Sequence, residues 1–62
     1  MNLRTTYITT GSGLYEVRFW NDSGEIDEII FWPRPTGRIV QLDELDVGFA
    51  ARLEEYIEEL TR

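Results

Sequence analysis

Two sets of side chains in this chain of 62 residues have types and spacings that could serve chemistry at a surface. The first is a run of glutamates near the C-terminus, in which like charges recur four residues apart: Glu54, Glu55, Glu58 and Glu59. The second is a pair of tryptophans, Trp20 and Trp32, with Arg18 close to the first. Tryptophan and arginine are over-represented among residues that dominate binding energy at protein interfaces. Both sets point to binding.

Catalysis has little support in the composition. The chain has neither histidine nor cysteine, the residues most often used in general acid–base and nucleophilic catalysis. A domain of this size also has little room for a buried cleft that would shift the pKa of a carboxylate. The acidic run at residues 43–46 lacks the spacing of a calcium loop, and helix capping explains it better. We therefore expect no enzyme activity, no catalytic residues, no cofactor and no metal site.

The formal net charge of −6 argues against direct binding to DNA, RNA or anionic lipid, because these polyanions attract lysine and arginine. No apolar stretch approaches the roughly 20 residues of a membrane span, and the N-terminus lacks the apolar region of a signal peptide. The absence of cysteine fits a reducing compartment. We expect a protein partner with a basic surface, no contact with membranes, and a cytoplasmic location.

The C-terminal glutamates have two explanations, which both remain open. Like charges four residues apart destabilise an isolated helix by roughly 0.2–0.5 kcal/mol per pair, and the helix dipole disfavours them in its C-terminal half. A rise of about 1.5 Å per residue places such charges about 6 Å apart, so they could imitate the phosphates of a nucleic acid. The alternative is a solvated helix face, on which Arg52 near Glu55 and Arg62 near Glu58 offset the repulsion.

The tryptophans belong to the strands of a predicted β-hairpin. Residues 14–20 and 25–32 are rich in β-branched and aromatic side chains, and residues 21–24 have the composition of a turn. Gly24 suits the left-handed conformation that ends a three-residue connection. That connection predicts the pairs Trp20–Ile26, Phe19–Asp27, Arg18–Glu28, Val17–Ile29, Glu16–Ile30, Tyr15–Phe31 and Leu14–Trp32. A four-residue loop would set Trp20 against Glu25, and we prefer the first register because it forms a charge pair and apolar pairs.

This hairpin is apolar on both faces, because successive side chains of a strand alternate across a sheet. One face carries Tyr15, Val17, Phe19, Ile29 and Phe31, and the other carries Leu14, Arg18, Trp20, Ile26, Ile30 and Trp32. From Leu45 onward the apolar residues follow a helical period, and the acidic residues before Val47 suit its N-terminus. We expect this helix to pack on the first face. Neither that face nor the apolar stripe of the helix contains arginine.

The other elements complete an α+β fold. Residues 3–10 are β-prone and lead through a glycine turn into the hairpin, which makes a three-stranded antiparallel meander. Pro33 and Pro35 end the third strand, and residues 38–42 form a short fourth strand or an extended segment. A C-terminal helix packs on one face. We expect a single small domain over residues 1–62.

The second hairpin face, called the tryptophan face below, is the candidate partner-binding surface. Its members are Leu14, Arg18, Trp20, Ile26, Ile30 and Trp32, and the glutamates of the helix are added to them as binding candidates. Two alternatives remain: the segment from Pro33 to Leu42 folds over this face, or this face is the core. So short a chain without disulfides or zinc is often stabilised by a dimer interface or a bound partner.

These features support a non-enzymatic protein-binding module in two versions. In the first, it is an inhibitor or adaptor whose acidic helix occludes a basic, nucleic-acid-handling protein. In the second, it is a structural or assembly subunit that forms homodimers or larger assemblies through the tryptophan face. In size and charge the chain is similar to phage-encoded inhibitors of host machinery, including anti-CRISPR proteins. This resemblance covers no motif, and it would imply a role in the host cytoplasm.

Overall fold

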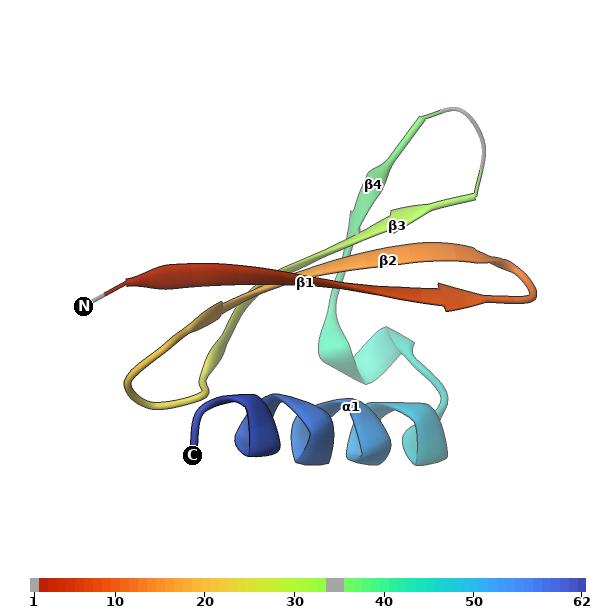
Figure 1. Cartoon of the computed structure of the whole chain (residues 1–62). Coiled ribbons are helices and arrows are strands. Elements are labelled where there is room, and N and C mark those ends of the chain that lie inside the picture. Colours follow the sequence, from red (N-terminus) through yellow and green to blue (C-terminus); the bar gives the residue numbers. More distant parts are fainter. Residues whose placement is uncertain (1, 34–35) are drawn as a thin grey trace.

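The computed structural model describes residues 2–33 and 36–62, in which four strands form an antiparallel sheet in the order β1-β2-β3-β4 (Figure 1). The strands are β1 (Leu3–Thr10), β2 (Gly13–Trp20), β3 (Ile26–Trp32) and β4 (Arg38–Val40), and a short 3₁₀ helix η1 (Leu42–Glu44) precedes α1 (Val47–Leu60). The predicted α+β meander, its short fourth strand and its C-terminal helix are confirmed. In the predicted proline connection, Arg34 and Pro35 lie outside the described residues.

The pairing of β2 with β3 follows the predicted register from Leu14 opposite Trp32 to Arg18 opposite Glu28. The predicted three-residue connection, in contrast, is wrong. The backbone N–H of Trp20 donates to the carbonyl of Glu25 at 2.9 Å, so the connection is the four-residue loop 21–24. Gly24 does take the expected left-handed conformation, with φ of 74°.

A β-bulge at Asp27 reconciles this loop with the rest of the ladder. Phe19 pairs with Ile26, and the register shifts between Arg18 and Phe19, so that Asp27 is the extra residue. The predicted pairs Trp20–Ile26 and Phe19–Asp27 are therefore wrong. The bulge retains the Arg18–Glu28 pair and also turns Ile26 toward the helix, where it packs against the core. Partial burial of Ile26 against the core explains why it leaves the tryptophan face.

The core lies between the sheet and α1, on the face for which we predicted helix packing. Val17, Phe19 and Ile29 of the sheet are buried there, and Leu53 and Ile57 are the buried residues of α1. Phe49 packs against Tyr15 with ring centroids 5.1 Å apart and ring planes tilted by 49°. Asp46 caps the helix, because its carboxylate accepts a hydrogen bond from the N–H of Phe49 at 3.2 Å.

The C-terminal end of α1 is stabilised by a residue from the other end of the chain. Arg4 donates from Nη1 to the carbonyl of Leu60 at 2.9 Å and to Oδ1 of Asn21 at 3.0 Å. Its guanidinium also lies 5.3 Å from the ring centroid of Phe19. A cation at this position interacts favourably with the helix dipole, which offsets part of the penalty from the nearby glutamates. None of the helices in the described residues is long and apolar enough to cross a membrane.

The burial of α1 gives a first prediction. Leu53 is 2% exposed, so Leu53→Ala should lower the free energy of unfolding by about 2–5 kcal/mol. In so small a domain that loss should abolish most of the cooperative thermal transition followed by circular dichroism. Val47→Ala is the matched control on the same helix, because Val47 is 84% exposed and should change stability by less than about 0.5 kcal/mol. Equal thermal transitions for the two variants would contradict the placement of Leu53 in the core.

Candidate protein-binding surface

The side of the sheet opposite α1 carries no helix or strand of the described residues (Figure 1). We call this side the open face. The strand registers place on it the side chains of Leu3, Thr5, Tyr7, Thr9, Leu14, Glu16, Arg18, Trp20, Glu28, Ile30, Trp32 and Ile39. Several of its large apolar side chains are well exposed: Tyr7 and Ile39 at 60%, Leu3 at 46% and Trp32 at 38%.

Five of the six binding residues predicted on the hairpin meet on this face. Leu14, Arg18, Trp20, Ile30 and Trp32 lie together as expected, whereas Ile26 belongs to the core side because of the bulge. The flanking strands add Leu3, Tyr7 and Ile39, which sequence reasoning did not include. The alternation of β1 and β4 could have identified them, but only once the pairing of those strands was known.

The two alternatives for this face can now be decided. The tryptophan face is not the core, since the buried residues all lie on the other side. In the described part of the segment after Pro33, Gly37 covers only the edge of this face, where it lies against the ring of Trp32. Residues 38–40 instead pair with β3 in the plane of the sheet, and Val40 and Leu42 turn toward the helix side.

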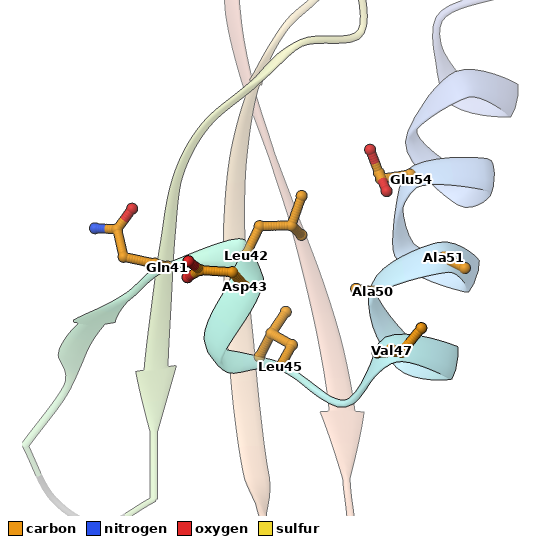
Figure 2. A pocket seen from close by; sticks show the side chains of 8 residues that line it. All are labelled: Gln41, Leu42, Asp43, Leu45, Val47, Ala50, Ala51 and Glu54. Atoms are coloured by element: carbon orange, nitrogen blue, oxygen red, sulfur yellow. The ribbon is translucent and has the colours of Figure 1, made fainter.

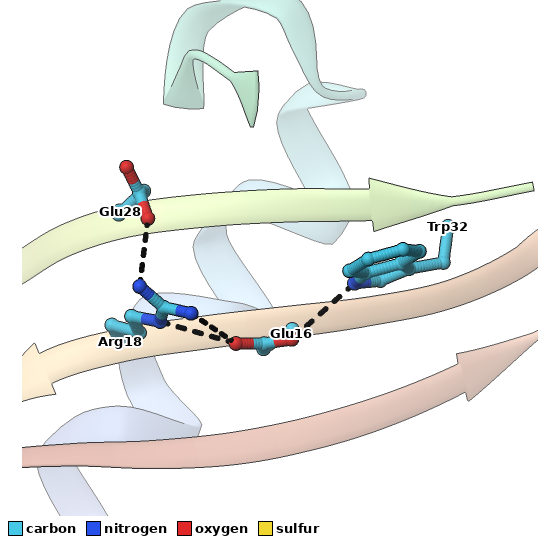
Figure 3. A network of polar contacts seen from close by, with 4 residues as sticks. All are labelled: Glu16, Arg18, Glu28 and Trp32. Carbon is cyan, nitrogen blue, oxygen red and sulfur yellow. Dashed lines mark hydrogen bonds and ion pairs between the residues drawn. The ribbon is translucent and has the colours of Figure 1, made fainter. Parts of the chain in front are cut away.

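A polar network occupies the centre of the open face (Figure 3). Arg18 donates to Oε2 of Glu16 from Nε at 3.1 Å and from Nη2 at 2.8 Å, and to Oε1 of Glu28 from Nη1 at 3.2 Å. The hydrogen bond to Glu16, together with the charges of Glu16 and Glu28, raises the pKa of Arg18, so this residue stays cationic. The side chain of Glu16 is only 13% exposed. Both carboxylates at the centre thus share one guanidinium within the protein.

Trp32 is held in place from two directions. Its Nε1 donates to Oε1 of Glu16 at 3.3 Å (Figure 3). Its ring also lies against Gly37, where a Cβ atom would come within 2.7 Å of two ring carbons. Glycine is therefore needed beside the indole. Fixing the side chain before binding lowers the entropy cost of association. The predicted register already set Trp32 diagonally to Glu16, so this contact could have been inferred.

The four C-terminal glutamates are exposed, but they divide between the two flanks of α1. Glu54 lines a groove of about 600 Å³ between η1 and the helix, whose apolar wall includes Leu42 and Leu45 (Figure 2). Glu58 joins Glu54 around a hollow beside Ile26. Glu55 and Glu59 line the opposite flank with Arg52 and Tyr56. The glutamates therefore form two pairs that face in different directions.

The predicted ion pairs on the helix are found only in part. Arg62 lies 3.6 Å from Glu58, and both side chains are about 70% exposed, so this pair contributes little to stability. The expected contact of Arg52 with Glu55 is absent from the ion pairs of the described residues. Those residues also contain no group of three or more acidic side chains arranged to hold a metal ion.

Comparisons with known proteins add no functional information. The sequence matches no protein-family model, and it matches no curated protein and no solved structure.

The packing of Trp32 gives a second prediction. Gly37→Ala should displace the indole and break its hydrogen bond to Glu16, because the added methyl group would overlap the ring. The indole N–H signal of Trp32 in a ¹⁵N NMR spectrum, assigned with Trp20→Phe, should shift and exchange faster with solvent. Gly11→Ala is the control, since a Cβ there meets nothing within 4 Å. An unchanged indole signal in Gly37→Ala would contradict the close contact between Gly37 and the ring of Trp32.

Proposed function

We propose that this protein is a non-enzymatic protein-binding module that acts in the cytoplasm and binds a partner protein through its open face. One observation carries the proposal: a sheet face with four well-exposed large apolar side chains lies outside the core of a very small domain. Large apolar side chains exposed together on one face, here around a polar centre, favour a protein interaction site.

The chemistry of the open face also favours docking of a protein. Tryptophan, tyrosine and arginine supply much of the binding energy at interfaces, and here Trp32, Tyr7 and Arg18 share one surface. The charges of Arg18, Glu16 and Glu28 are already paired with one another. A partner that covers them buries carboxylates that already accept hydrogen bonds from Arg18, which lowers the cost of their desolvation.

The opposite placement of the open face and the acidic helix favours an adaptor. A single flat surface that covers the open face cannot also contact the exposed flanks of α1, which lie on the other side of the sheet (Figure 1). An adaptor binds one protein through the open face and directs its glutamates toward a second, basic protein, such as one that handles nucleic acid. The net charge of −6 supports that choice of partner.

Self-assembly through the open face is the second candidate. A two-fold axis would bring the same apolar patch together from two copies, and oligomerisation is a common source of stability in chains this short. The two functions differ in their response to salt. Contacts led by the glutamates weaken as salt rises, whereas apolar assembly does not.

A matched pair of variants tests the open face. Ile39 on the open face and Val47 on the helix are both exposed aliphatic residues, at 60% and 84%. Ile39→Asp should weaken binding to a partner captured from the native cells by about tenfold or more, because an unpaired charge would be buried at the interface. Val47→Asp should bind as the wild type does. Equal binding by both variants would contradict a role for this face.

Sedimentation of the same preparations separates the two candidates. A wild-type dimer at micromolar concentration that Ile39→Asp dissociates, and Val47→Asp does not, would assign the open face to self-assembly. A wild-type protein that is monomeric and still binds the captured partner would support the adaptor.

Replacing all four glutamates with glutamine tests the acidic flanks. The fold should stay intact or become slightly more stable, because like-charge pairs near the C-terminal end of α1 are removed. Association with a basic partner should slow, because electrostatic steering is lost. Thermal melts and association rates, measured on the same preparations at two salt concentrations, provide the comparison. An unchanged association rate would show that the glutamates are a solvated surface without a role in binding.

A further inference from the structure

The strand β1 forms one edge of the sheet, and half of its backbone hydrogen-bonding groups point away from the protein. The N–H of Asn21 donates to the carbonyl of Asn2 at 2.9 Å, which makes these residues a hydrogen-bonded pair of the β1–β2 ladder. Such pairs alternate along an antiparallel ladder. The outward N–H and C=O groups are therefore those of Leu3, Thr5, Tyr7 and Thr9.

This edge lacks the usual protection against pairing with another strand. Natural sheets block their edges with short strands, lysine, proline or bulges. The opposite edge, β4, has only three residues, whereas β1 has eight, with no proline or lysine and no register shift. The charge of its Arg4 is directed to the end of α1.

An apolar groove runs beside the same edge. It has a volume of about 390 Å³ and lies between β1 and α1, lined by Tyr7, Ile8, Phe49, Arg52, Leu53 and Tyr56. A strand added next to β1 would direct every second side chain toward the helix side, over this groove. The edge and the groove would thus bind the backbone and the side chains of the same segment.

We propose that β1 binds an extended segment of another protein, which adds to the sheet as a fifth strand. Its side chains on the groove side are apolar at the centre, to match Ile8 and Tyr56, and basic toward the ends. The basic residues follow from the acidic flank next to the groove, where Glu55 and Glu59 lie beside Arg52 and Tyr56. Backbone hydrogen bonds supply affinity and the groove supplies specificity in this type of recognition.

A second copy of the chain is a poorer occupant of this edge. Two β1 strands paired antiparallel in one sheet would place both helices on the same side, with their Glu55 and Glu59 flanks facing each other. Repulsion between like charges opposes that arrangement. This surface shares Tyr7 with the open face, but its outward backbone groups and the rest of its groove lie at the β1 edge, so this proposal does not depend on the one above.

A synthetic peptide tests the proposal on the intact protein. The probe is a blocked nine-residue peptide in which threonine alternates with arginine, valine, isoleucine and arginine, in that order. Its binding should slow hydrogen exchange of the outward amides of Thr5, Tyr7 and Thr9, measured by NMR. Thr5→Pro removes one outward N–H and should weaken binding by about fivefold or more, whereas Thr5→Ala, which keeps the N–H, should not.

Two double variants test the basic side chains of the segment. Glu55→Gln with Glu59→Gln should weaken binding of the peptide by about threefold or more, because these carboxylates flank the groove. Glu54→Gln with Glu58→Gln makes the same change of charge on the other flank and should have little effect. Equal losses from both would overturn the proposed basic segment.

Two further results would overturn the proposal. The first is an absence of amide protection along β1, or equal binding of the peptide by Thr5→Pro and Thr5→Ala. The second is a wild-type dimer that Thr5→Pro dissociates and Thr5→Ala does not, which would assign the edge to a second copy. Ile39→Asp should bind the peptide as the wild type does, so failure of the open-face proposal would leave this one standing.

Discussion

The packing of α1 on one side of the sheet determines the rest of this structure. Leu53 and Ile57 fill the space over Val17, Phe19 and Ile29, and all five side chains are almost fully removed from water. The described residues contain no second α-helix to cover the other side. Because both sides are apolar, the choice of the inner side also determines which apolar residues remain outside.

Charge explains why this side is the inner one. The opposite side carries Glu16, Arg18 and Glu28, whose burial under a helix would cost several kilocalories per mole of desolvation for each ion. On the open face the three side chains form a paired network and keep part of their hydration. The bulge at Asp27 has the same origin, since it keeps Arg18 opposite Glu28 while Ile26 joins the core.

The fold leaves three surfaces that point in different directions. The open face is apolar around a paired polar centre, the flanks of α1 are acidic, and the β1 edge offers free backbone groups beside a groove. Separate surfaces of different chemistry suit a protein that connects others better than one that covers a single target. Interfaces of limited area are typical of transient contacts. An adaptor of this size would therefore be expected to exchange its partners readily.

Sequence patterns alone identified much of this protein. Alternation identified the two faces of the hairpin in residues 14–20 and from Glu28 to Trp32, and the Arg18–Glu28 pair identified the register over the same part. Helical periodicity identified α1 and the side chains that it buries. These are relations between residues that are close in the chain or joined by one turn. The local geometry of strands and helices is sufficient to predict them.

Tertiary contacts decided the rest. The bulge that moves Ile26, the contact of Gly37 with Trp32 and the division of the glutamates between two flanks depend on how separate elements pack. Arg4 reaches the end of α1 across 56 positions of sequence, and no local pattern signals such a contact. The edge position of β1 and the groove beside it likewise exist only in the assembled sheet. Each depends on burial and hydrogen bonding between distant segments, whose free energies are determined by the whole fold and not by neighbours in the chain.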